Sequence, residues 1–233
     1  MDINKLDSHI YKPYEDELGR VRTRFMQMGG LVEQQLIEAT RAIDEVDSGI
    51  AELVLEKESA IDDMEMELDE ACTQIIARRQ PVASDLRSIL ATNRCVNDLE
   101  RIGDEAKKIA RMAISLAAEG DSTRGYKEVR HISAAVSKML NEALDAFARL
   151  DYEAALKIMD LDKSIDEDYQ SAVRELITFM MEDPRSISRM INILWVLRSL
   201  ERIGDHAKNI CEAIVYIVKG KDIRHGNRDI LAK

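Results

Sequence analysis

Two pairs of acidic residues occur in nearly identical surroundings at two places in the sequence. Glu100 and Asp104 lie within LERIGDEAKKI, and Glu201 and Asp205 lie within LERIGDHAKNI, which begins 101 positions later. Nine of the eleven residues match, whereas the eleven residues from position 85 and the eleven from position 186 share none. Carboxylates four residues apart on a helix lie on one face, where they could bind a hard cation such as Mg²⁺ or Mn²⁺, or iron.

These acid pairs bring no benefit to folding. On a helical wheel, Leu99 and Ile102 centre the buried face, and Glu100 and Asp104 point away from it on a strip predicted to be exposed. Like charges at this spacing cost a helix roughly 0.2–0.5 kcal/mol. The intervening glycine costs about 0.5–1 kcal/mol relative to alanine. A costly pattern that occurs twice indicates a function.

A preceding helix in each half adds a second pair of acids. These are Glu58 and Asp62 in the first half, and Asp162 and Asp166 in the second. The sequence leaves open whether the two helices of a half turn their acids toward each other. Such acid pairs are also common on solvated helix faces, and nearby bases such as Lys107 could simply neutralise them. A third acid, Glu65, has Tyr169 as its counterpart, which puts the ligand set of the second half in doubt.

The elements that would position these acids are long helices. Ala, Leu, Ile, Met, Glu, Lys and Arg dominate, and the chain has only three prolines and ten glycines in 233 residues. Turn and cap signals predict six helices, at about 7–46, 49–79, 84–119, 126–150, 152–182 and 185–219. Apolar steps of four and three predict an all-α fold of two tandem antiparallel three-helix bundles from an internal duplication. The predicted units are 1–120, 121–220 and a polar C-terminal tail at 221–233.

Composition narrows the classes of function. The chain has 44 acidic and 33 basic residues, a net charge of −11, which argues against a nucleic-acid partner. No signal peptide is recognisable, and the longest apolar run, 213–218, is too short to cross a membrane. We therefore expect a soluble cytoplasmic protein without direct membrane insertion. No nucleophilic or phosphate-cradling motif is present, so we expect no enzyme. Glu128 and His131 match only half of a di-iron carboxylate signature.

The repeated segments, together with several others, resemble the PhoU family of phosphate-signalling regulators. The resemblance covers nearly the whole chain. Besides both LERIGD copies, it includes MGGLVEQQ from Met28, IIARRQP from Ile75, MMED from Met180 and VKG from Val218. No single segment is specific, but the combination is.

The resemblance implies a cytoplasmic, non-enzymatic protein, usually a homodimer. Such proteins couple a phosphate ABC transporter, through its ATPase subunit, to a sensor histidine kinase. They act as negative regulators of phosphate uptake and of the starvation response when phosphate is plentiful. In some members the acid-x-x-x-acid motifs bind metal ions, which here implies Glu100, Asp104, Glu201 and Asp205, with Glu58, Asp62, Asp162 and Asp166 less firmly. The alternatives are a ligand-free helical scaffold and a carboxylate di-metal enzyme.

Overall fold

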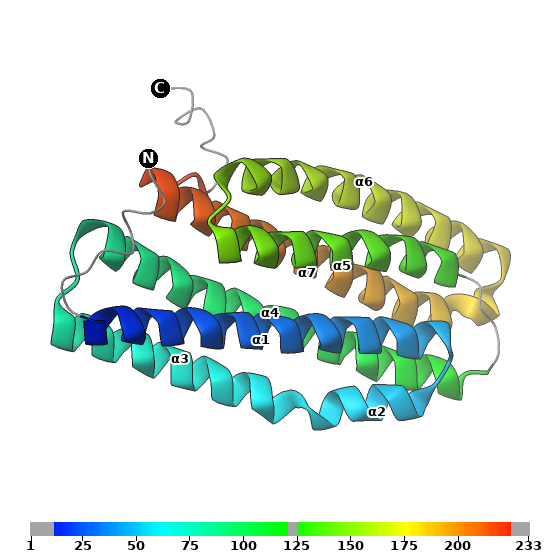
Figure 1. Cartoon of the computed structure of the whole chain (residues 1–233). Helices are drawn as coiled ribbons and strands as arrows, with labels where there is room; N and C mark the ends of the chain where they lie inside the picture. Colours follow the sequence, from blue (N-terminus) through cyan, green and yellow to red (C-terminus); the bar gives the residue numbers. More distant parts are fainter. Residues whose placement is uncertain (1–11, 121–124, 225–233) are drawn as a thin grey trace.

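The chain forms long helices that run nearly parallel or antiparallel to one another (Figure 1). The computed structural model describes residues 12–120 and 125–224, except the side chain of Glu58. The first half contains α1 (Lys12–Asp44), α2 (Ser48–Glu56), α3 (Glu58–Arg79) and α4 (Ala83–Ala118). The second half contains α5 (Tyr126–Arg149), α6 (Tyr152–Glu182), the 3₁₀ turn η2 (Pro184–Ser186) and α7 (Ile187–Lys219). No strand occurs in these residues, so the all-α prediction is confirmed.

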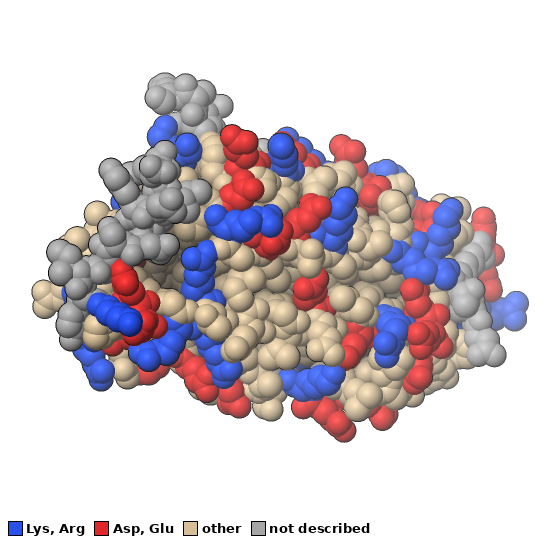
Figure 2. Space-filling view, in the orientation of Figure 1, with Lys and Arg blue, Asp and Glu red and all other residues tan. Residues whose placement is uncertain are grey.

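The two helices that carry LERIGD, α4 and α7, lie side by side at the centre of the molecule. α3 packs on α4 and α6 packs on α7, so these two helices flank the central pair. α1 and α5 contact each other and cover one side of α4 and α7. Acidic and basic side chains are interspersed over the face formed by α1, α5 and α6 (Figure 2).

The apolar stripes predicted for α4 and α7 form the core. Every residue of both stripes is at most 5% exposed: Cys95, Leu99, Ile102, Ala106, Ile109, Ala113 and Leu116 on α4, and Val196, Leu200, Ile203, Ala207, Ile210, Ile214 and Ile217 on α7. Burying a Leu or Ile side chain stabilises a fold by roughly 1.5–3 kcal/mol. The stripes therefore account for much of the attachment of the two halves to each other. No helix of the described residues is long and apolar enough to span a bilayer.

The predicted helix starts are largely correct. The carboxylate of Asp47 accepts hydrogen bonds from the backbone N–H groups of Gly49 and Ile50, and Asp151 accepts one from that of Ala154. The single helix predicted over 49–79 is wrong, because the chain leaves helical geometry at Lys57 (φ −82°, ψ 0°). No glycine or proline marks this break. The Lys57 ammonium bonds the carboxylate of Glu38 on α1 at 2.9 Å, a tertiary contact made at the break itself.

The structure tests the predictions for the two ends of the chain only in part. The first helix, predicted over 7–46, is described only from Lys12 and ends at Asp44; positions 7–11 lie outside the described residues. The tail was predicted to be polar and loose from 221, but Ile223 is only 1% exposed. The first residues of the tail therefore pack against the bundle. Residues 225–233 lie outside the described part.

The Gly29–Gly30 pair on α1 provides a matched test of helix packing. A Cβ on Gly29 would lie 2.8 Å from a methyl of buried Leu144 on α5, whereas one on Gly30 would meet nothing within 4 Å. We expect Gly30→Ala to raise the free energy of unfolding by about 0.5–1 kcal/mol through helix propensity. Gly29→Ala should lower it by about 1 kcal/mol through overpacking. Urea unfolding of both variants measures this, and an equal gain in both would contradict close α1–α5 contact.

Candidate functional site

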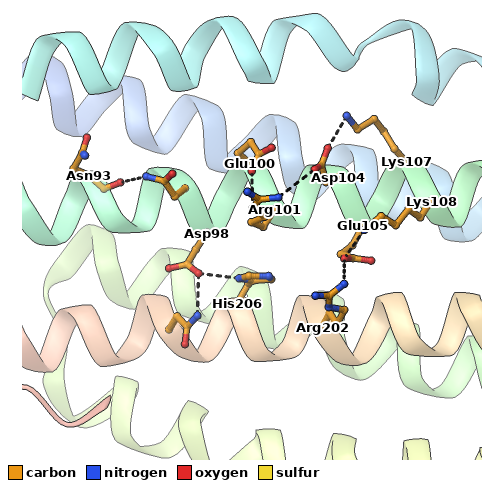
Figure 3. Close-up of polar contacts among 12 residues, drawn as sticks. Asn93, Asp98, Glu100, Arg101, Asp104, Glu105, Lys107, Lys108, Arg202 and His206 are labelled. Carbon is orange, nitrogen blue, oxygen red and sulfur yellow. Dashed lines mark hydrogen bonds and ion pairs between the residues drawn. The ribbon is translucent and has the colours of Figure 1, made fainter. Parts of the chain in front are cut away.

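The acids of LERIGD lie beside the contact between α4 and α7. We call Glu100 and Asp104 of α4, with Asp62 and Glu65 of α3, the first acidic strip. The second acidic strip consists of Glu201 and Asp205 of α7 with Asp162 and Asp166 of α6. In Figure 3, Glu100 and Asp104 lie on the α3 side of α4, whereas Asp98 and Glu105 point toward α7.

The two strips lie on the same face of the molecule. Glu105 pairs with Arg202 and Asp98 with Asn209, so α4 and α7 run antiparallel with Gly103 and Gly204 at the same level. The two copies are thus related by an approximate two-fold axis near these glycines. An axis that exchanges two antiparallel helices is perpendicular to the plane containing them, so equivalent strips lie on the same side of that plane.

The prediction that these acids are fully exposed is wrong for three of the four. The side chains of Glu100, Asp104 and Glu201 are 18%, 29% and 13% exposed. Of the four acids, only Asp205 is exposed. The cause is the close approach of the flanking helix. A Cβ on Gly103 would lie 3.3 Å from both Ile61 of α3 and the Gln35 side chain of α1. The glycine therefore lets α3 pack tightly enough to cover the neighbouring acids.

In the first strip, a basic side chain pairs with each acid of the LERIGD segment. The Lys107 ammonium lies 2.7 Å from the Asp104 carboxylate, and Arg101 lies 3.3 Å from Glu100. Burial opposes ionisation of Asp104, but the hydrogen bond and charge of Lys107, with Lys108 and Arg101, hold its pKa below the usual value. Burial and the charge of Asp104 raise the pKa of Glu100, with a smaller effect from Glu65 of α3.

The partners expected on α3 are only partly recovered. Asp62 is half-buried on α3, and the prediction for Glu58 falls on a side chain outside the described part of the structure. Glu65, which was predicted only as a third acid of this helix, is the α3 carboxylate whose charge helps to raise the pKa of Glu100. Its spacing of three residues from Asp62 was the available signal, since residues three apart share a helix face.

In the second strip, α6 and α7 do turn their acids toward each other. Buried Asp162 accepts a hydrogen bond from the ammonium of Lys208. Burial raises the pKa of Asp166, and repulsion from Asp162 and Asp205 raises it further. Burial and repulsion also raise the pKa of Asp205, for which Asp162 is the main repelling charge. They raise the pKa of Glu201 as well, for which Asp205 is the main repelling charge. Burial is the largest cause for all three acids, and repulsion among them adds to it, while nearby cations such as Arg198 oppose both.

The donor set of the second strip suits a hard cation. Carboxylate oxygens are the ligands that Mg²⁺ and Mn²⁺ prefer, and they also bind iron. Glu201 directs one oxygen to Arg198 at 2.7 Å, while its other oxygen is buried without a hydrogen-bond partner. No three Asp, Glu, His or Cys side chains of the described residues converge in a ready-made metal geometry. The second strip thus fits a cation by chemistry and charge, and the first strip less well because Lys107 holds Asp104.

The two positions at which the LERIGD segments differ lie in the contact between them. Glu105, whose counterpart is His206, is buried and accepts hydrogen bonds from Lys108 and Arg202. His206 and Asn209 both bond one carboxylate oxygen of Asp98, at 2.8 and 2.9 Å. We call these contacts the α4–α7 seam (Figure 3). The seam was not predicted from the sequence, although the two mismatches in the repeat were its signal.

The isolated catalytic candidates lie at ordinary surface or core positions. His131 lies on exposed surface, 3.1 Å from Asp168, and does not face a second Glu-x-x-His motif. Cys72, Cys95 and Cys211 are buried thiols, and burial raises the pKa of each. A thiol held in its protonated form is a poor nucleophile and metal ligand.

The contrast between the strips predicts opposite effects of removing one charge. Asp104→Asn should lower stability because it breaks the Lys107 pair, and Asp205→Asn should raise it because it relieves repulsion, each by up to about 1 kcal/mol at these partly solvated sites. Asp205 has a raised pKa, so its contribution to stability falls as pH rises from about 4 through that pKa. Asp104 has a lowered pKa, so its contribution is lost as pH falls below about 4. Thermal unfolding between pH 3 and 7 measures both; a loss of stability in both variants would contradict the contrast.

Comparison with known proteins gives consistent matches over nearly the whole chain. The PhoU domain model matches two stretches, residues 25–113 and 129–214. A Pseudomonas aeruginosa protein named phosphate-specific transport system accessory protein PhoU homolog is 56% identical over 96% of this chain and 93% of its own. The phosphate-specific transport system accessory protein PhoU of Escherichia coli is 43% identical over 100% of this chain and 96% of its own.

Solved structures agree with these matches. The crystal structure of PhoU from Pseudomonas aeruginosa superposes with a TM-score of 0.88 at 56% identity, covering 89% of this chain and all of that one. The phosphate transport system regulatory protein PhoU from Streptococcus pneumoniae gives a TM-score of 0.83 at 29% identity, covering 90% and 98%. Sequence and fold therefore lead to the same conclusion: the chain belongs to the PhoU family.

Proposed function

We propose that this protein is a cytoplasmic regulatory accessory protein of a phosphate-specific transport system. Relatives that match nearly the full chain carry that name, which supports the general role. In the finer proposal, the protein is a homodimer that links the ATPase subunit of the transporter to a phosphate-responsive sensor histidine kinase. It keeps the starvation response off, and restrains uptake, when phosphate is plentiful.

The observation that carries the proposal is the joined pair of bundles with two inequivalent strips on one face. An adaptor needs a stiff body with more than one recognition surface. The buried stripes of α4 and α7 lock the two halves together, and the seam adds hydrogen-bonded ion pairs. The same duplicated motif thus yields a neutralised surface on one side of the seam and an acidic one on the other, so two partners need not compete for one surface.

We further propose that the second strip holds a metal ion. Asp205 and Glu201 of α7 would be its main ligands, with Asp162 and Asp166 of α6 completing the oxygen set. A bound Mg²⁺, Mn²⁺ or iron ion would supply the positive charge that the mutual repulsion of these acids calls for. Glu100 and Asp104, with Asp62 and Glu58 of α3, would bind more weakly because Lys107 must first be displaced.

The runner-up is a scaffold that binds no ligand. The ion pairs of Lys107 with Asp104 and of Lys208 with Asp162 favour it, since each already satisfies an acid from within the chain. In this alternative the acids only balance the charge of neighbouring bases. The buried oxygen of Glu201 without a partner is the observation that speaks against it.

Metal content distinguishes these alternatives. Purified without an affinity tag and incubated with Mn²⁺, the protein should bind the ion in the second strip. Glu201→Gln with Asp205→Asn should abolish most of that binding, while Glu100→Gln with Asp104→Asn should remove less. Binding should weaken as pH falls, because carboxylates must be ionised to act as ligands. Elemental analysis and circular dichroism are the measurements; unchanged metal content in both double variants would favour the scaffold.

Deletion of the gene tests the regulatory role directly. Cells without it should express a starvation-promoter reporter in rich phosphate, whereas the parent strain stays silent. The intact gene supplied in trans should restore silence, and Glu201→Lys should restore it less well than Asp104→Asn, because only the former alters the second acidic strip. Equally low output with and without the gene would refute the regulatory proposal.

A further inference from the structure

An exposed apolar patch lies where α6 turns into α7. Five large side chains form it, with exposures of 48% for Ile177, 80% for Met181, 41% for Ile187, 41% for Ile191 and 59% for Trp195. We call these five residues the apolar patch. Scattered apolar residues are normal on a surface, but several large ones gathered on adjoining turns mark an interaction site more often.

The patch is continuous across the two helices. α6 and α7 run antiparallel, with Asp162 bonded to Lys208 and Ile165 packed against the position of Gly204. Counting from these contacts toward the η2 turn, at the same rise per residue on both helices, places Ile177 level with Ile191. Met181 and Ile187 flank the short η2 turn. The five side chains therefore belong to one end of the α6–α7 pair.

The same face carries the second acidic strip further along. Ile187 and Asp205 are eighteen residues apart, which is five full helical turns, so they lie on one line of α7. Ile177 and Asp166 are eleven residues apart, about three turns, and share a line of α6. A ligand lying along α6 and α7 would thus meet apolar side chains first and carboxylates next.

The first half covers only part of the equivalent surface with its own chain, because Leu90 is 37% exposed. The counterparts of Ile187, Ile191 and Trp195 on α4 are Leu86, Leu90 and Arg94. The Arg94 guanidinium lies over the Tyr216 ring, 5.5 Å from its centroid, and nearby Ile223 of the tail is only 1% exposed. The approximate symmetry is therefore broken at this place, where a stacked arginine is replaced by an exposed tryptophan.

We propose that the apolar patch and the second acidic strip together bind an amphipathic helix of a partner protein, one whose apolar stripe continues into lysine or arginine. Asp162, Asp166, Glu201 and Asp205 gather four carboxylates, while the chain itself supplies Lys208 and Arg198 as close cations. Basic side chains on the partner complete this charge balance as its apolar residues cover Trp195. The identity of the partner rests on the proposed adaptor role, but the binding of such a helix to this surface does not.

A second copy of this chain fits the surface less well. A two-fold contact through the patch would place the same surface on both subunits. If the axis of that contact ran along α7, the second acidic strips of the two copies would face each other, in a chain whose net charge is already −11. Like charges brought together across an interface oppose association.

Trp195 is the only tryptophan in the chain, so its fluorescence reports directly on the patch. The probe is a synthetic 18-residue helix with leucines along one stripe and arginines at the end of that stripe. Titrated into the full-length protein, it should shift Trp195 emission to shorter wavelength and protect the ring from iodide quenching, with saturation. The same peptide with glutamates in place of arginines should bind at least tenfold more weakly.

Matched variants locate the site. Ile191→Ser and Ile177→Ser change exposed residues and should each weaken peptide binding about tenfold without loss of helicity. Leu53→Ser, which alters a 54% exposed leucine on α2, should leave binding unchanged. Asp205→Asn should reduce the preference for the arginine peptide over the glutamate one.

Three results would overturn the proposal. The first is a Leu53→Ser variant that weakens peptide binding as much as Ile191→Ser and Ile177→Ser do. The second is equal affinity for the arginine peptide and the glutamate peptide. The third is a Trp195 shift that depends on protein concentration without peptide and coincides with dimerisation in sedimentation, because the patch would then belong to a second copy. All three results are measured on the purified protein. They therefore test peptide binding separately from the reporter assay and the metal analysis that test the proposed function.

Discussion

The packing of α4 against α7 is the contact on which the rest of the structure depends. Both helices bury their full apolar stripes, and each holds its own flanking helix in place. The seam then fixes their register through polar pairs that two identical copies could not make. Glu105 takes Arg202, whereas its counterpart His206 takes Asp98. Two identical glutamates at these places would leave Asp98 facing a negative charge. The difference between Glu105 and His206 therefore allows the two copies of the motif to pack against each other.

The same register sets the difference between the two strips. Gly103 would bring a Cβ within 3.3 Å of Ile61, whereas the nearest contact at Gly204 is 3.7 Å, to Ile165. The side chain of Ile61 therefore approaches Gly103 more closely than that of Ile165 approaches Gly204. Lys107 bonds the acid of its own helix, Asp104, while its counterpart Lys208 reaches across to Asp162 on α6. Nearly identical sequence thus produces one strip in which Lys107 pairs with an acid of its own helix. In the other strip, burial and the charge of Asp162 keep the pKa of Asp205 raised.

The sequence was sufficient for what depends on one helix alone. The stripes of α4 and α7 and the caps at Asp47 and Asp151 were correctly predicted because periodicity and local hydrogen bonding decide them. It was not sufficient for the break at Lys57, which neither a glycine nor a proline marks, nor for the partial burial of Glu100. A helical wheel describes the core side of one helix and says nothing of how closely the next one packs. The sides of α4 and α7 that face α3 and α6 are therefore where prediction failed and where the candidate site lies.

The strips lie where a binding site can be combined with a stable core. Acids at the outer edge of a helix–helix contact are partly shielded from water, which strengthens their repulsion and their attraction for any cation. Deeper burial would force them to be neutral, as the raised pKa of the thiols in the core illustrates. Full exposure of these acids to water would screen their charges. Glu201, 13% exposed and with one oxygen unbonded, lies between these limits. Its position follows from the close packing of α6 on α7, so the core that stabilises the fold also sets how strongly the strip attracts positive charge.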